Sequence, residues 1–269
     1  MASAQGTATR VEHGANRTRA RDWAEIQERM LVPLYEAVYD RLDVGPATSV
    51  LGLGCRSGLA LLLATARGAQ VTGLEPAAEL RELARGRLLR VAAAGAGELW
   101  DPHAPRTAHS LVTVFEQLHR AEDPRALVAG AARATLPGGH VVLAGWGPAE
   151  RCQSAAVLDV ARRRGGPHGG PDPFALSAPG ALEQLLAEAR LRPAGSGRVS
   201  CPFAYPDLDS AVRGLLSTGL YDAAVEYSGE VPVTKELAEA LHPFGAADGT
   251  VRMANVFRYV VAEKVSQGF

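Results

Sequence analysis

The sequence predicts an α/β fold in which a mostly parallel sheet carries helices on both of its faces. Three observations predict it: a strand–glycine turn–helix–strand unit over residues 48–76, later short apolar runs bounded by turn residues, and amphipathic helical stretches between them. A chain of 269 residues with 47% hydrophobic residues suits one or two domains with a buried core. The formal net charge of −1 gives no electrostatic case for nucleic acid or an anionic membrane as partner.

The first unit suggests a ligand. A short apolar run at 49–51 is followed by a glycine-rich turn over 52–58. A helix-forming run at 59–64 and a second strand at 70–74 come next, and Glu75 stands at the end of that strand. Glycines allow a sharp turn and close approach to a ligand, and a helix N-terminus offers backbone N–H groups. A carboxylate about 20 residues further on can accept hydrogen bonds from a ribose. The unit therefore predicts a nucleotide-like ligand.

Later motifs appear in a matching order. Gly54, Gly58 and Glu75-Pro76 are followed by an apolar strand at 111–115, and then by Leu136-Pro137-Gly138-Gly139 before a further strand. Over about residues 20–145 this set resembles the class I S-adenosylmethionine (SAM) dependent methyltransferases of the small-molecule type. The resemblance implies a Rossmann-like, mostly parallel seven-stranded sheet, an antiparallel last strand at 252–261, and a helical lid insertion.

The resemblance also implies a site. SAM is the expected cofactor, a small organic molecule is the expected methyl acceptor, and Glu75 is expected to hold the ribose while Glu98 accepts from the adenine amino group. The residues expected to bind the cofactor are Gly52, Gly54, Cys55, Arg56, Gly58, Glu75, Pro76, Glu98, Leu99 and Phe115. His119 follows the fourth strand and is the candidate general base, since histidine suits proton transfer near neutral pH. A structural role for His119 is the alternative.

Two positions depart from the family pattern. Gly52 stands where the family has an acid that binds the methionine amino group, and Arg56 replaces the middle glycine of the loop. Losing one charge-assisted hydrogen bond costs about 1.5–3 kcal/mol, or roughly 10- to 150-fold in affinity. Two hypotheses therefore stand. The chain is a SAM-dependent methyltransferase, or it is a methyltransferase-fold protein with a decayed cofactor site that serves in binding, regulation or non-methyl chemistry such as a cyclisation.

The expected organisation is a flexible tail over residues 1–20 and a single methyltransferase-like domain over 21–269. Within it we expect N-terminal cap helices at 21–47, the cofactor-binding half at 48–145, a Gly/Pro-rich loop at 146–176, and the helical lid at 206–247. Ser177 is the expected cap of the helix that follows the loop. The sixth strand is expected at 199–203.

The composition also bears on disulfides, metal sites and membrane association. Three cysteines without a C-x-x-C pair argue against a disulfide framework and a zinc site, so no metal is expected. No apolar run reaches 18 residues and the first residues lack the apolar stretch of a signal peptide, so we expect a soluble, cytoplasmic protein without a membrane partner. The sequence does not specify an oligomeric state.

Overall fold

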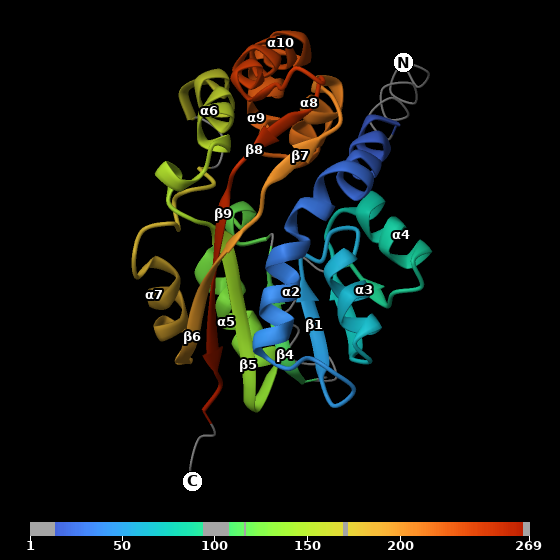
Figure 1. The fold of residues 1–269 in the computed structure, drawn as a ribbon. Helices are drawn as coiled ribbons and strands as arrows, with labels where there is room; N and C mark the ends of the chain where they lie inside the picture. Colours follow the sequence, from blue (N-terminus) through green and yellow to red (C-terminus); the bar gives the residue numbers. More distant parts are fainter. Residues whose placement is uncertain (1–13, 94–107, 116, 169–171, 266–269) are drawn as a thin grey trace, which may run out of the picture.

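The computed structural model describes residues 14–93, 108–115, 117–168 and 172–265. Its main sheet has seven strands in the order β3-β2-β1-β4-β5-β9-β6 (Figure 1). Only β9 runs against its neighbours, pairing antiparallel with both β5 and β6, while the other pairs are parallel. This order and the single reversed strand confirm the expected fold class. The strands are β1 (Ser49–Leu53), β2 (Gln70–Leu74), β3 (Val91–Ala92), β4 (His109–Val114), β5 (Thr135–Trp146), β6 (Arg192–Ser200) and β9 (Val256–Glu263).

Helices cover both faces of this sheet (Figure 1). One face packs against α2 (Val32–Arg41), α3 (Leu59–Ala66) and α4 (Ala78–Gly86), and the other against α5 (Pro124–Ala134) and α7 (Ala181–Glu188). Because successive side chains of a strand point to opposite faces, Leu111 joins the first core and Val112 the second. The helix α5 begins where Asp123 caps it by accepting a hydrogen bond from Ala126 N.

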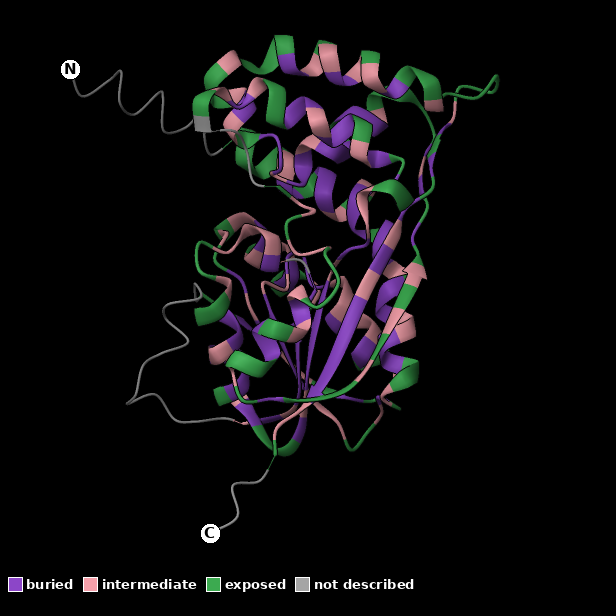
Figure 2. Cartoon of the chain, turned by 90° about the vertical axis from the view of Figure 1, so that its left-hand side faces the viewer, coloured by how far each residue is buried: buried purple, intermediate pink, exposed green. Residues whose placement is uncertain are grey.

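A helical cap lies beyond the carboxyl ends of the parallel strands (Figures 1 and 2). It consists of α6 (Ser154–Arg164), α8 (Leu208–Ser217), α9 (Asp222–Ser228) and α10 (Glu230–Leu241). A small two-stranded sheet of β7 (Phe203–Tyr205) and β8 (Val251–Met253) connects the cap to the main sheet. The expected helical insertion is therefore present as α8, α9 and α10.

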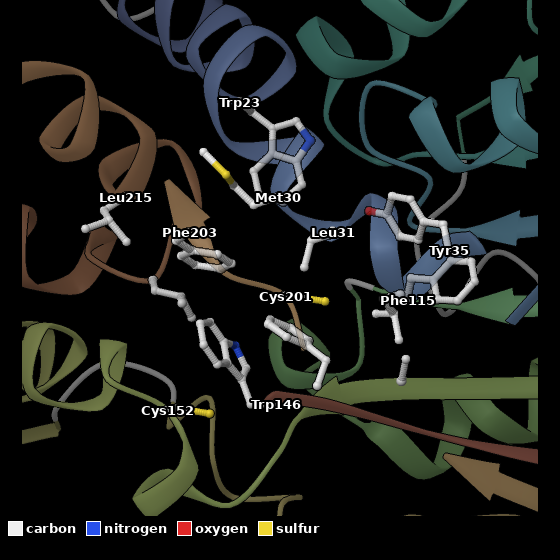
Figure 3. Close-up of a cluster of buried hydrophobic side chains, with 14 of the residues drawn as sticks. Trp23, Met30, Leu31, Tyr35, Phe115, Trp146, Cys152, Cys201, Phe203 and Leu215 are labelled. Carbon is white, nitrogen blue, oxygen red and sulfur yellow. The ribbon is translucent and has the colours of Figure 1, made fainter. Parts of the chain in front are cut away.

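Aromatic side chains pack at the junction of the sheet and the cap (Figure 3). The ring of Trp146, at the end of β5, lies 5.5 Å from Phe174, 5.6 Å from Phe203 and 4.5 Å from Phe257 between centroids. Trp146 is only 5% exposed. Because aromatic pairs add to the stabilisation from buried area, this cluster ties β5, β7 and β9 together.

The N-terminal region differs from expectation. The chain is already helical from residue 14, so residues 14–20 are not a flexible tail, and residues 1–13 lie outside the described residues. The helix continues through η1 (Trp23–Gln27) and η2 (Glu28–Leu31) into α2. Pro33 lies in the first turn of α2, where its missing N–H needs no partner. It therefore stands at the start of α2.

The second half differs at four places. Residues 146–176 contain α6 as well as loops, and the N-cap of α7 is Gly180 at φ 84°, not Ser177. The strand β6 ends at Ser200, before Pro202, because proline cannot donate to a strand ladder. The expected last strand is broken at Asn255, which is 1% exposed and whose Oδ1 accepts a hydrogen bond from Ser154 N.

Candidate cofactor site

The glycine-rich loop after β1 has left-handed backbone at three alternate residues. The φ angles are 63° at Gly54, 53° at Arg56 and 88° at Gly58. A Cβ on Gly54 would lie 2.6 Å from the Cβ of Gln117, so glycine is required there. Arg56 holds the same conformation at a cost of roughly 1–2 kcal/mol. The loop therefore keeps the backbone of a glycine-rich turn even where an arginine has replaced the glycine.

Glu75 joins this loop to the end of β2. Its side chain is buried; Oε2 accepts from Arg56 N at 2.8 Å and Oε1 accepts from Ala77 N at 3.0 Å. The backbone N–H groups of Gly54 and Cys55 both donate to Leu74 O. Because each carboxylate oxygen has two lone pairs, both oxygens of Glu75 keep acceptor capacity for a ribose.

A small cavity of about 20 Å³ lies against the loop. It is lined by several of the expected residues, namely Gly52, Gly54, Cys55, Arg56 and Phe115, together with Tyr35 of α2. The rings of Tyr35 and Phe115 lie 4.9 Å apart (Figure 3). A volume of this size holds about one water molecule. In this conformation α2, through Tyr35, therefore helps to close the cavity.

Gly58, Glu75 and Pro76, which were also expected at the site, are not among the residues that line this cavity. Pro76 is exposed at the end of β2. Glu98 and Leu99 lie outside the described residues, so their expected contacts with adenine stay predictions.

Apolar side chains fill the space beside Gly52, the position where the family has an acid. A Cβ on Gly52 would lie 3.1 Å from Leu61 Cδ2 and 3.2 Å from Cys55 Cβ. Gly73, the register partner of Gly52 on β2, faces the same two side chains, since its Cβ would lie 2.6 Å from Cys55 Sγ. Burial raises the pKa of the Cys55 thiol, so Cys55 acts here as a small apolar residue. An acid at position 52 would require Leu61 to move.

The side chain of Arg56 links the loop to the structures above it. Its guanidinium lies 4.3 Å from the centroid of the Trp23 ring, and Nη2 donates to the carbonyl of Ser217 at 3.3 Å. Arg56 is 6% exposed. Because cation–π contacts strengthen when they are desolvated, this stacking stabilises the closed arrangement of the N-terminal helix, the loop and α8.

Glu28, which sequence reasoning missed, supports the loop from η2. It is 1% exposed, accepts from Ser57 Oγ and from Leu59 N at 3.4 Å, and forms an ion pair with Arg87 at 3.2 Å. Burial raises the pKa of Glu28, while Ser57 and Arg87 oppose that rise. The helix α3 has no side-chain cap from its own N-cap residue, so Glu28 supplies an acceptor to that N-terminus. The sequence carries no signal that separates Glu28 from the neighbouring charged residues Glu25 and Arg29.

His119 lies in the short helix η4 (Leu118–Arg120) and is half-buried. Burial, followed by the charges of Arg120 and Arg56, lowers the pKa of His119 to about 3. A group with so low a pKa is neutral and a weak proton acceptor at neutral pH. The catalytic role expected for His119 stays a prediction, and this environment does not favour it.

The sheet order, the loop after β1 and the acid at the end of β2 define a protein with the class I methyltransferase fold. The chain belongs to the family described as "Methyltransferase domain", which matches it over residues 15–172. SAM is the cofactor that this family implies.

Known proteins similar to this chain agree with that assignment. A ubiquinone biosynthesis O-methyltransferase from Serratia proteamaculans is 36% identical over 97 residues, which cover 35% of this chain and 40% of that protein. The chain thus spans about two fifths of the length of the curated relatives it matches.

Two solved structures share the fold. A candidate methyltransferase from Bacillus halodurans C-125 superposes with a TM-score of 0.58 at 13% identity, covering 86% of this chain and 99% of that one. The geranyl diphosphate C-methyltransferase of Streptomyces coelicolor A3(2) gives 0.50 at 16% identity, covering 86% and 78%. At such identities the likeness concerns the fold alone.

The backbone of the site suits SAM, but side chains occupy part of the space that SAM would need. The left-handed loop, the N-terminus of α3 and Glu75 form the cradle that a nucleoside needs. Arg56 and Tyr35 occupy the space beside that cradle and leave about 20 Å³. SAM binding therefore requires these two side chains, and the elements that carry them, to move.

Among the described residues, no group of three or more His, Cys, Asp or Glu side chains is arranged to hold a metal ion. In the same part of the chain, every helix is too short or too polar to cross a bilayer.

Proposed function

We propose that this protein is a SAM-dependent methyltransferase that acts on a small organic acceptor. The observation that carries the proposal is the hydrogen bond from Arg56 N to Glu75 Oε2, because it keeps the loop and the acid in the arrangement of a nucleoside cradle. The family assignment and the small-molecule O-methyltransferases among the relatives support it.

Bound SAM would supply an electrophilic methyl group. The glycines of the loop over 54–58 would let it lie close to the backbone, and Glu75 would orient the ribose through the lone pairs that its backbone partners leave. Tyr35, Phe115 and the helical cap would exclude water around the reacting atoms. Rate enhancement would come chiefly from holding acceptor and methyl group in contact.

The direct test is a calorimetric titration of the purified protein with SAM and with S-adenosylhomocysteine. We expect saturable binding. In a separate thermal unfolding experiment, the Tm should rise by on the order of 5–10 °C at a ligand concentration about 100 times the dissociation constant. Radiolabelled SAM is then offered with a panel of phenols, amines and carboxylic acids. Label transfer to one class identifies the class of the acceptor, and the absence of transfer with intact SAM binding would contradict the proposed methyltransferase activity.

A second candidate function is a methyltransferase-fold binding or regulatory protein without cofactor chemistry. The closed cavity of about 20 Å³ and the filled space beside Gly52 favour it. Absence of SAM binding at millimolar concentration, with the fold intact by circular dichroism, would support this reading over the first.

A further inference from the structure

Three arginines from separate segments converge on the C-terminal end of α8. Arg19 belongs to the N-terminal helix, Arg56 to the glycine-rich loop and Arg120 to η4. Each donates to one of three successive backbone carbonyls: Arg19 Nη2 to Leu216 O (3.1 Å), Arg56 Nη2 to Ser217 O (3.3 Å) and Arg120 Nη1 to Thr218 O. The last carbonyls of a helix carry partial negative charge, so they are natural partners for cations. We call these residues the arginine cluster.

The arginine cluster lines a pocket of about 200 Å³ between the N-terminal helix, α4 and the end of α8. Trp23 forms part of its wall, and its ring stacks on the guanidinium of Arg56. Arg56 also lines the small cavity at the glycine-rich loop. A molecule in this pocket would therefore lie directly beside the cofactor cradle.

The charges around the pocket favour an anion. Its lining contains three arginines against two acids, Glu79 and Asp222, and Asp222 already forms an ion pair with Arg19. The bonds to α8 are made to neutral carbonyls, which do not cancel a full positive charge.

The N-terminus of α4, which also reaches the pocket, carries partial positive charge. Ala77, the N-cap of the nine-residue helix α4, lines the pocket and gives that helix no side-chain cap. The positive end of the α4 dipole therefore lies at the pocket, where Glu75, which accepts from Ala77 N, and Glu79 in the first turn offset part of it.

We propose that this pocket binds a carboxylate or phosphate group of the methyl acceptor, so that the enzyme acts on an acidic small molecule. The inference rests on the proposed function. Guanidinium groups bind both anions through paired N–H donors, and an anion there would take over contacts that the α8 carbonyls make in the closed state. In the absence of an acceptor, the α8 carbonyls thus accept the hydrogen bonds that the acceptor's anionic group would accept when bound.

The test uses the whole protein and inorganic phosphate as probe, titrated calorimetrically against sodium chloride of matched ionic strength. We expect saturable phosphate binding that weakens by about tenfold or more in Arg120→Gln, which removes one charge-assisted contact. The matched control is Arg213→Gln, also at α8, where the arginine pairs with Asp22 outside the pocket. Its phosphate affinity should stay within about twofold of wild type, because it loosens α8 without changing the pocket. If Arg120→Gln does not fold, Arg19→Gln takes its place.

Two outcomes would overturn the proposal. One is phosphate binding no stronger than chloride, or unchanged in the cluster variants. The other is displacement of phosphate by SAM but not by 5′-methylthioadenosine, which lacks the carboxylate, since the pocket would then hold the cofactor's own carboxylate. We expect phosphate to bind equally well with SAM present. A failure of SAM to bind at all would leave the phosphate titration readable, so the two proposals fail separately.

Discussion

The backbone N–H of Arg56 donates to Glu75 Oε2 across 2.8 Å, so the residue that replaces a family glycine is bonded to the acid expected to hold the ribose. The bond uses the backbone and not the side chain, so it survives the replacement. The side chain instead reaches Trp23 and the end of α8. Arg56 therefore preserves the cradle and blocks it at the same time.

Arg56→Gly should tighten SAM binding by about tenfold, because the side chain no longer fills the cavity and a larger fraction of molecules is open. The left-handed strain of roughly 1–2 kcal/mol is relieved in the same variant. Calorimetry with SAM measures the affinity, and Arg56→Ala is the control because it removes the guanidinium but keeps the Cβ. Weaker binding in Arg56→Gly would instead identify the guanidinium as a ligand contact.

The sequence specified the backbone of the site better than its side chains. The spacing of Gly54, Gly58 and Glu75 predicted one βαβ unit, and the structure has it because glycine backbone freedom is a local property. The packing of Glu28 under the loop could not be predicted, since it joins residues 29 apart through a helix whose rotation the sequence does not set. The convergence of Arg19 and Arg120 depends on α8, about 200 and 100 residues away.

Strand ends were predicted less well for a related reason. The run through residues 252–261 alternates like one strand, and period-2 alternation says which face a residue occupies but not which sheet it joins. The buried amide of Asn255, bonded to Ser154, divides the run between β8 and β9. The same division separates the helical cap from the main sheet.

Glu28→Gln should make stability less dependent on pH. Because burial raises the folded pKa of Glu28 above its ordinary value of 4.5, the folded state holds the proton more tightly between the two values. Wild-type stability therefore loses a contribution as pH rises from 4.5 through the folded pKa, and this fall should vanish in the variant. Urea unfolding at intervals from pH 4.5 to 8 measures it, with the exposed Glu82→Gln as control. Parallel pH curves for wild type and Glu28→Gln would contradict the prediction.

His119→Asn should lower kcat/KM for the acceptor by less than about threefold, because a histidine whose pKa is about 3 is neutral and a poor base. Removal of a true general base costs about 10²- to 10⁴-fold. Stability gives a second readout. The lowered folded pKa contributes stability above pH 6.5 that is lost as the pH falls towards 3, and the variant should lose less over that range. A kcat/KM loss of a hundredfold with an altered pH profile would restore His119 as the base.

Gly52→Asp should destabilise the protein by about 1–3 kcal/mol, because its Cβ would lie 3.1 Å from Leu61 Cδ2 in a packed core. Leu61→Ala alone should cost about 2–5 kcal/mol through the cavity it leaves. The double variant should cost less than the sum, since the new side chain enters the space that Leu61 vacates. Urea unfolding of the four proteins closes this cycle.

The same four proteins test whether the lost acid limits cofactor affinity. Relative to Leu61→Ala, the double variant regains a carboxylate for the methionine amino group, worth about 1.5–3 kcal/mol. Its SAM affinity should therefore rise by roughly 10- to 150-fold, while its affinity for 5′-methylthioadenosine, which lacks the methionine amino group, should not change. Equal gains for both ligands would mean that the double variant merely opens the cavity. Additive stability losses without any gain in SAM affinity would show that Gly52 is not where the cofactor's amino group binds.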